Sequence, residues 1–134
     1  MGLANLITAI VAPGGSGWEV TWASDGKTPR DLADQSLTAT VDRASKEVAA
    51  LYANQRRAAD AELQFAIYPW DGGGEIDVIL DVLGSPGKFE ASDIQGSGIS
   101  FSADTLEALV SGAERYVPDK TKVMLRWSRR VSEL

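Results

Sequence analysis

The sequence contains neither cysteine nor histidine. Without cysteine, the chain forms no disulfide, holds no iron–sulfur cluster and offers no thiolate to zinc or to a substrate. Without histidine, it lacks the side chain most often used as a general base and as a transition-metal ligand. Ser–His–Asp and Cys–His catalytic arrangements are therefore excluded within one chain. We predict no cofactor, no metal and no enzymatic activity.

Basic residues are also in deficit, with 13 Lys and Arg against 19 Asp and Glu and a net charge of −6. Nucleic acids and anionic membrane surfaces attract proteins through clustered Lys and Arg, so this balance argues against both partners. No apolar run approaches the roughly 20 residues of a membrane-spanning helix. The apolar N-terminus is not preceded by the basic residues of a signal peptide. We therefore expect a cytoplasmic protein.

The length of 134 residues and the 44% hydrophobic content are typical of one globular domain over 1–134. Alternating hydrophobic residues predict strands over 18–23, 61–68, 75–82 and 121–127, with shorter strands over 88–94 and 99–101. Residues 3–12 form either a strand that pairs with 18–23 across the Pro13–Gly17 turn or a short amphipathic helix; we prefer the strand.

Two helices are predicted from capping residues and apolar spacing. The first begins at the Thr28–Asp31 capping box and extends over 29–59. A helix of this length either protrudes from the domain or breaks, and the break is expected near Ser36–Thr40, where Ser and Thr weaken helix propensity. The second begins after Asp104 and Thr105 and ends before Pro118.

From the second strand onward, this order reads β-α-β-β-α-β, which predicts an α+β fold with a ferredoxin-like antiparallel sheet. An extra N-terminal strand and a decorated connection over 84–102 would be added to it, and both helices would cover one face. The alternative is a long helix packed on a curved antiparallel meander over 61–102. No internal repeat is visible in the sequence.

The strongest local feature is an acidic stripe on the predicted 75–83 strand. Glu75, Asp77 and Asp81 share its polar face, and Asp71 lies in the preceding loop. Such a stripe is a cation site, a docking surface for a basic partner, or simply a solvated sheet face. The loop lacks the Asp-x-Asp-x-Asp-Gly spacing of a calcium loop, so we predict no metal. If the last strand were a neighbour, Lys122–Asp77 and Arg126–Asp81 pairs would explain the acidic residues.

Two aromatic residues, Tyr68 and Trp70, flank Pro69 at the start of the glycine-rich loop. Three of the four tryptophans fit core positions, and Trp70 is the one that does not. A loop tryptophan beside acidic residues is a plausible binding hot spot, and its alternative is a ring folded back over the hairpin edge.

These observations favour a non-catalytic protein-interaction domain of the small adaptor, regulatory or immunity type. It would bind another protein or itself through an open sheet face or edge, using Tyr68, Trp70, Asp71, Glu75, Asp77 and Asp81. The second hypothesis is a small-molecule sensor module of ACT-like type, with an unidentified ligand. The third is a carboxylate-based hydrolase or isomerase that uses Asp71, Glu75, Asp77 and Asp81.

Overall fold

The computed structural model describes residues 6–14, 17–22, 32–53, 61–69, 75–93, 96, 98–117 and 121–134. The strands are β1 (Leu6–Gly14), β2 (Gly17–Trp22), β3 (Leu32–Asp34), β4 (Glu62–Ile67), β5 (Val78–Ser85), β6 (Lys88–Ser92), β7 (Ser100–Ala103) and β8 (Val123–Arg130). The helices are α1 (Leu37–Tyr52), α2 (Leu106–Tyr116) and the short 3-10 helix η2 (Val131–Glu133).

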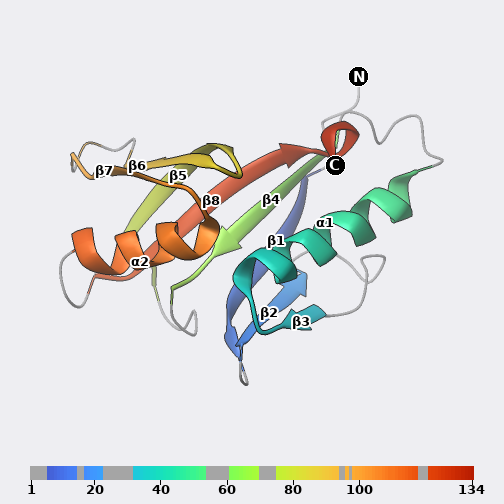
Figure 1. The fold of residues 1–134 in the computed structure, drawn as a ribbon, viewed down its shortest axis with the longest axis horizontal. Coiled ribbons are helices and arrows are strands. Elements are labelled where there is room, and N and C mark those ends of the chain that lie inside the picture. Colours follow the sequence, from blue (N-terminus) through green and yellow to red (C-terminus); the bar gives the residue numbers. More distant parts are fainter. Residues whose placement is uncertain are drawn as a thin grey trace.

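The eight strands of the described residues form one mixed sheet in the order β3-β2-β1-β4-β8-β5-β6-β7 (Figure 1). Two neighbouring pairs are parallel, β1 with β4 and β5 with β8. These parallel pairs are joined in the middle of the sheet by the antiparallel β4–β8 pair. The predicted α+β class is confirmed.

The ferredoxin-like order is not confirmed. It required a hairpin between the 61–68 and 75–83 strands, whereas β8 lies between β4 and β5. The same fact argues against the alternative meander over 61–102. The prediction paired strands that are close in the chain. In the structure, each parallel pair joins strands that are separated by a helix, as parallel crossovers require.

The N-terminal segment is a strand and not a helix. Strand β1 forms the predicted hairpin with β2, in which Gly14 pairs with Gly17. The predicted 29–59 helix is wrong at 32–34, which forms the edge strand β3. Helix α1 starts within the predicted break, and the Ser36 hydroxyl accepts a hydrogen bond from the Ala39 amide at 3.2 Å. The Thr28–Asp31 capping box lies outside the described residues.

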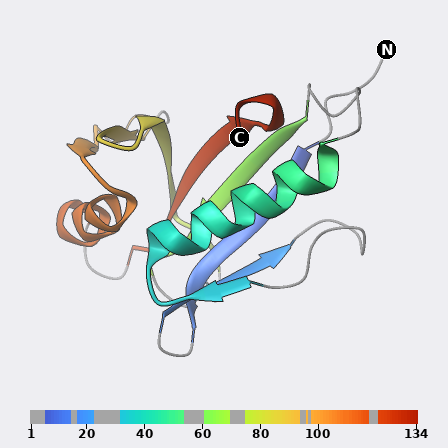
Figure 2. The same cartoon turned by 45° about the vertical axis from the view of Figure 1, so that its right-hand side comes forward.

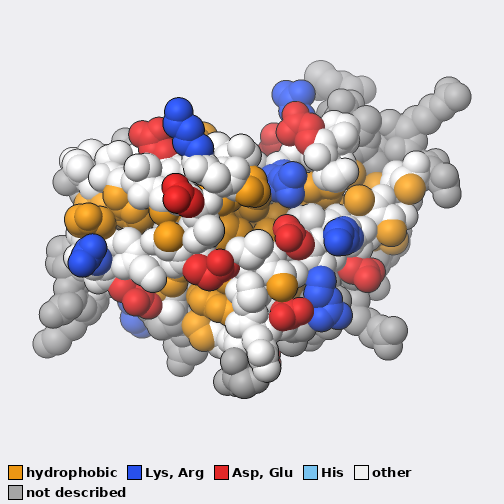
Figure 3. All heavy atoms as spheres, viewed as in Figure 1, with side chains coloured by type: hydrophobic (Ala, Val, Ile, Leu, Met, Phe, Trp, Pro, Cys, Tyr) orange, Lys and Arg blue, Asp and Glu red, His pale blue; other side chains and the backbone are white. Residues whose placement is uncertain are grey.

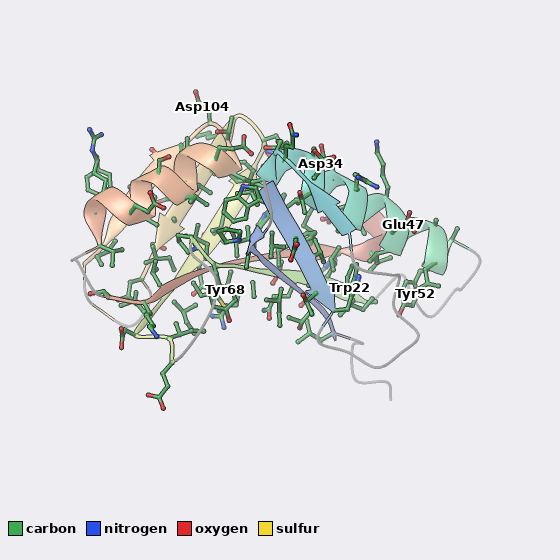
Figure 4. The ribbon with its side chains drawn as sticks, turned by 90° about the horizontal axis from the view of Figure 1, so that it is seen from below. Trp22, Asp34, Glu47, Tyr52, Tyr68 and Asp104 are labelled. Carbon is green, nitrogen blue, oxygen red and sulfur yellow. The ribbon has the colours of Figure 1, made fainter. Side chains whose placement is uncertain are left out.

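Both helices pack on the same face of the sheet, as predicted. Figure 2 shows α1 lying along β1 and β4, and the view from below places both helices on one side of β4 and β8 (Figure 4). The apolar stripes of both helices join the alternate residues of the strands in one core cluster. Its helical members include Leu37, Val41, Ala44, Val48, Leu106, Leu109 and Ala113.

Aromatic side chains in this core contact one another across the two halves of the sheet. The Trp127 ring of β8 stacks on Phe65 of β4, with centroids 5.9 Å apart. It also meets Phe89 of β6 edge to face at 5.3 Å, and the Arg129 guanidinium lies 5.1 Å from the Trp127 ring centroid. Such pairs add to the stability gained from area burial alone.

The sheet contains an internal repeat of structure, although no repeat is visible in the sequence. The N-terminal unit (β1-β2-β3-α1-β4) and the C-terminal unit (β5-β6-β7-α2-β8) have the same element order. In each unit the fourth strand lies parallel beside the first, and the third strand is at the outer edge.

The strand register repeats as well. Ile7 pairs with Leu63 in the N-terminal unit, and the equivalent pair in the C-terminal unit is Val78 with Val123. In the hairpins, Gly14 pairs with Gly17, and the equivalent pair is Ser85 with Lys88. The helices align without a gap after their Ser36 and Thr105 caps. The residues Leu37, Ala39, Val41 and Ala44 recur at the same spacing as Leu106, Ala108, Val110 and Ala113.

A pseudo-two-fold axis relates the two units. Under this equivalence Ala66 of β4 corresponds to Arg126 of β8, and these two residues pair directly with each other. The two pairs on either side of Ala66–Arg126 are Phe65 with Trp127 and Ile67 with Leu125. The repeat makes each of these pairs equivalent to the other. The axis therefore passes through the Ala66–Arg126 pair.

Candidate functional site

The sheet face opposite the helices is covered by no element among the described residues; we call it the uncovered face. Its side chains alternate along each strand with those of the core. It carries, among others, Leu6 and Ile10 of β1, Ala66 of β4, Ile79, Asp81 and Leu83 of β5, and Met124 and Arg126 of β8.

The centre of the uncovered face is apolar. Ala66 and Met124 are buried, with exposures of 6% and 8%, yet they do not belong to the main core cluster. Ile10 pairs with Ala66, and Ile79 pairs with Met124, so two half-buried isoleucines extend this centre along the neighbouring strands. Together these residues form an apolar centre that no helix of the described residues covers.

Two leucines of the uncovered face are largely exposed. Leu6 is 53% exposed at the start of β1, and Leu83 is 64% exposed near the end of β5. Isolated exposed leucines are common on protein surfaces, but here they lie on the same face as the apolar centre.

A charged pair crosses the uncovered face beside this centre. Arg126 Nε donates a 2.8 Å hydrogen bond to Asp81 Oδ1, and the two residues are in direct register on β8 and β5. Their side chains are 38% and 18% exposed. The alternative explanation of the acidic stripe, a cross-strand ion pair, is therefore confirmed for Asp81.

The other two acidic residues do not share a strand with Asp81. Strand β5 begins only at Val78, so Glu75 and Asp77 precede it, and both are exposed. Asp77 Oδ2 accepts a hydrogen bond from the Lys122 amide at 2.8 Å, and the Asp77 amide donates to the Lys122 carbonyl at 2.8 Å. Asp77 thus fixes the start of β8 relative to β5. The predicted single stripe of Glu75, Asp77 and Asp81 is wrong.

Of the two aromatic residues predicted to bind a partner, only Tyr68 lies among the described residues. This residue directly follows β4 (Figure 4). It is half-buried, and its amide donates to the Val11 carbonyl at 2.8 Å. Trp70 and Asp71 lie outside the described residues. The proposed group of Tyr68, Trp70 and Asp71 therefore stays a prediction.

One concave feature was not predicted. A shallow groove of about 640 Å³ runs between β7 and α2, and its lining includes Phe101, Ser102, Gly112 and Tyr116. The signal in the sequence was Gly112, a glycine inside a helical apolar stripe, which commonly reports close packing. None of Glu75, Asp77 and Asp81 lines this groove.

Among the residues that the structure describes, no group of three or more acidic side chains is arranged to hold a metal ion. No helix in the described ranges is long and apolar enough to cross a membrane. No family model matches the chain, and no curated protein or solved structure is significantly similar to it.

Proposed function

We propose that this protein is a non-catalytic interaction domain, of the small adaptor, regulatory or immunity type, that binds another protein through its uncovered face. The observation that supports this is the exposure of two leucines, Leu6 at 53% and Leu83 at 64%, on the same face as the apolar centre around Ala66 and Met124.

The composition of the face fits a protein partner better than a small ligand. Protein interfaces combine an apolar centre with a polar rim, and arginine is enriched at their energetic hot spots. Here Ile10 and Ile79 flank the centre, and Arg126 is held in place by Asp81 while its side chain remains 38% exposed. Leu6 and Leu83 would add exposed apolar area near the rim.

Site-specific photo-crosslinking tests this proposal. A photoreactive residue replaces Leu83 on the uncovered face, and a matched control replaces Glu114, which is exposed on α2. We expect one protein partner to be crosslinked in cells from position 83 and not from position 114. Crosslinking to that partner only from position 114 would contradict the assignment of the face. Crosslinks between copies of this chain, with a doubled solution mass, would replace the partner by a second copy.

Affinity measurements with the identified partner then show whether an individual residue of the uncovered face contributes to binding. Leu83→Lys should weaken binding about tenfold, because it places a charge against an apolar contact. Leu51→Lys on α1, where Leu51 is 41% exposed, should leave the affinity unchanged. Equal losses for both variants would show that the uncovered face has no special role.

A further inference from the structure

Strand β7 forms the outer edge of the sheet, and on its outer side no other described strand pairs with it. The Asp93 amide donates to the Ile99 carbonyl at 3.0 Å, and Phe101 and Ala103 continue this pairing with β6. Because hydrogen-bonding direction alternates along a strand, the N–H and C=O groups of Ser100 and Ser102 point away from β6. No strand of the described part of the chain pairs with them.

Helix α2 lies alongside this edge and forms the other wall of the groove. The Phe101 ring lies against Gly112 so closely that a Cβ there would be 2.7 Å from Phe101 Cε2. Phe101 also stacks on Tyr116, with centroids 5.4 Å apart, and Tyr116 is 57% exposed. In the space-filling view, hydrophobic side chains form a band between β7 and α2 (Figure 3). The groove therefore has an apolar floor beside an unpaired strand edge.

In the N-terminal unit, an ion pair bridges the equivalent strand and helix. There Arg43 of α1 reaches Asp34 of β3, with Nη1 3.4 Å from Oδ2. Under the repeat, the counterparts of Asp34 and Arg43 are Ala103 and Gly112. Neither of these small residues can form such a bridge, and both line the groove of the C-terminal unit.

The two ends of the open groove carry opposite charges. Asp104 lies at the start of α2, and Arg115 lies in its last turn. An 11-residue helix is about 16 Å long, which matches about five residues of extended chain. A short extended segment can therefore span the groove and meet both charges.

We propose that the β7–α2 groove binds an extended peptide segment of a partner protein, which adds to the sheet as a strand antiparallel to β7. Ser100 and Ser102 hydrogen-bond its backbone. Its alternate apolar side chains lie over Phe101 and Ala103, a basic residue near its N-terminus faces Asp104, and an acidic residue near its C-terminus faces Arg115. Strand addition of this kind takes affinity from the backbone and specificity from alternate side chains. The groove is separate from the uncovered face.

The probe is the peptide acetyl-Lys-Val-Thr-Val-Thr-Glu-amide, titrated to millimolar concentration into the isotope-labelled full chain. We expect the largest amide chemical-shift changes at Ser100, Ser102 and Arg115, and slower exchange of the two serine amides. The peptide with Lys and Glu exchanged should bind about threefold more weakly, because the charges then clash at both ends in the antiparallel orientation. An N-methylated peptide should not bind. No shift changes on β7, or equal binding of the N-methylated peptide, would overturn the proposal.

Two variants test the site itself. Ser102→Pro removes one outward-facing N–H without breaking the β6–β7 ladder, and it should weaken the peptide about fivefold. The triple variant Phe101→Leu, Ala103→Asp, Gly112→Arg copies the N-terminal unit and should abolish binding by closing the groove. Leu83→Lys is the control on the uncovered face and should leave peptide binding unchanged. If Leu83→Lys alone abolished binding, the peptide would lie on the uncovered face and not in the groove.

Discussion

The N-terminal and C-terminal units follow the same path, but they differ where they meet solvent. Both have the same strand register, the same Ser or Thr cap and the same Leu, Ala and Val positions in the helix. They differ at the strand–helix edge, where Arg43 and Asp34 pair in one unit and Gly112 and Ala103 leave a groove in the other. The buried core residues and the helix caps are therefore shared by the two units, whereas the residues at the strand–helix edge differ between them.

The helices also differ in burial and length. Helix α1 has 16 residues and buries Ser45, whereas α2 has 11 residues and exposes the counterpart of Ser45, Glu114. The first helix therefore packs more deeply than the second. Substitutions at matched positions can measure this difference directly.

The largest expected effect is a buried charge in α1. Val48→Asp should lower the free energy of unfolding by about 3–5 kcal/mol, because Val48 is fully buried and the aspartate would have no partner. The equivalent substitution in α2, Val117→Asp, should lower the free energy of unfolding by less, because Val117 is 7% exposed at the end of α2. Urea unfolding measures both. Leu51→Asp, on the exposed side of α1, is the control and should stay within about 1 kcal/mol of wild type.

An intermediate loss of stability is expected when a contact between the first turns of the two helices is removed. Glu107 Oε1 accepts hydrogen bonds from the Thr38 amide, at 2.7 Å, and from the Thr38 hydroxyl. It thus satisfies a free amide in the first turn of α1 from the first turn of α2. Glu107→Ala should cost about 1–2 kcal/mol in thermal or urea unfolding, whereas Glu114→Ala on the same helix should be nearly neutral. Equal effects would mean that the bridge contributes nothing.

The smallest expected effect concerns two buried hydroxyls of α1. The Ser45 hydroxyl has no hydrogen-bond partner among the described residues, whereas the Thr40 hydroxyl donates to the Ser36 carbonyl at 2.9 Å. Ser45→Ala should therefore change stability by less than about 0.5 kcal/mol, on the stabilising side. Thr40→Val keeps the shape but loses the bond and should cost about 1 kcal/mol. A clear loss for Ser45→Ala would show that its hydroxyl is satisfied after all.

Local features of the fold could be predicted from the sequence, because they depend on residues close in the chain. The alternation of Leu63, Phe65 and Ile67 located β4, and Thr105 located the start of α2. The sheet order could not be predicted, because the β1–β4 and β5–β8 pairs join distant segments whose apolar faces are interchangeable. The helix prediction failed at 32–34 because these residues lie between a sequence typical of a capping box and the true cap, Ser36.

The candidate site shows the same limit. Asp81 and Arg126 were recognised as a pair that would form if their strands were neighbours, and only the sheet order decided that they are. The β7–α2 groove depends on Gly112 meeting Phe101 across a turn and a helix cap. Leu37–Ala44 and Leu106–Ala113 share a helical pattern, but too few of their residues are identical for the repeat to be recognised without the structure.

The pseudo-two-fold axis through Ala66 and Arg126 has a consequence for how such a sheet is assembled. Two copies of a half-length chain would complete the same sheet as a symmetric dimer, but each residue on the axis would then face its own duplicate. An arginine would oppose an arginine, and a glutamate at the helix start would oppose a glutamate. Covalent linkage of the halves removes that restriction, so alanine can sit across from arginine, and threonine can serve as donor to glutamate.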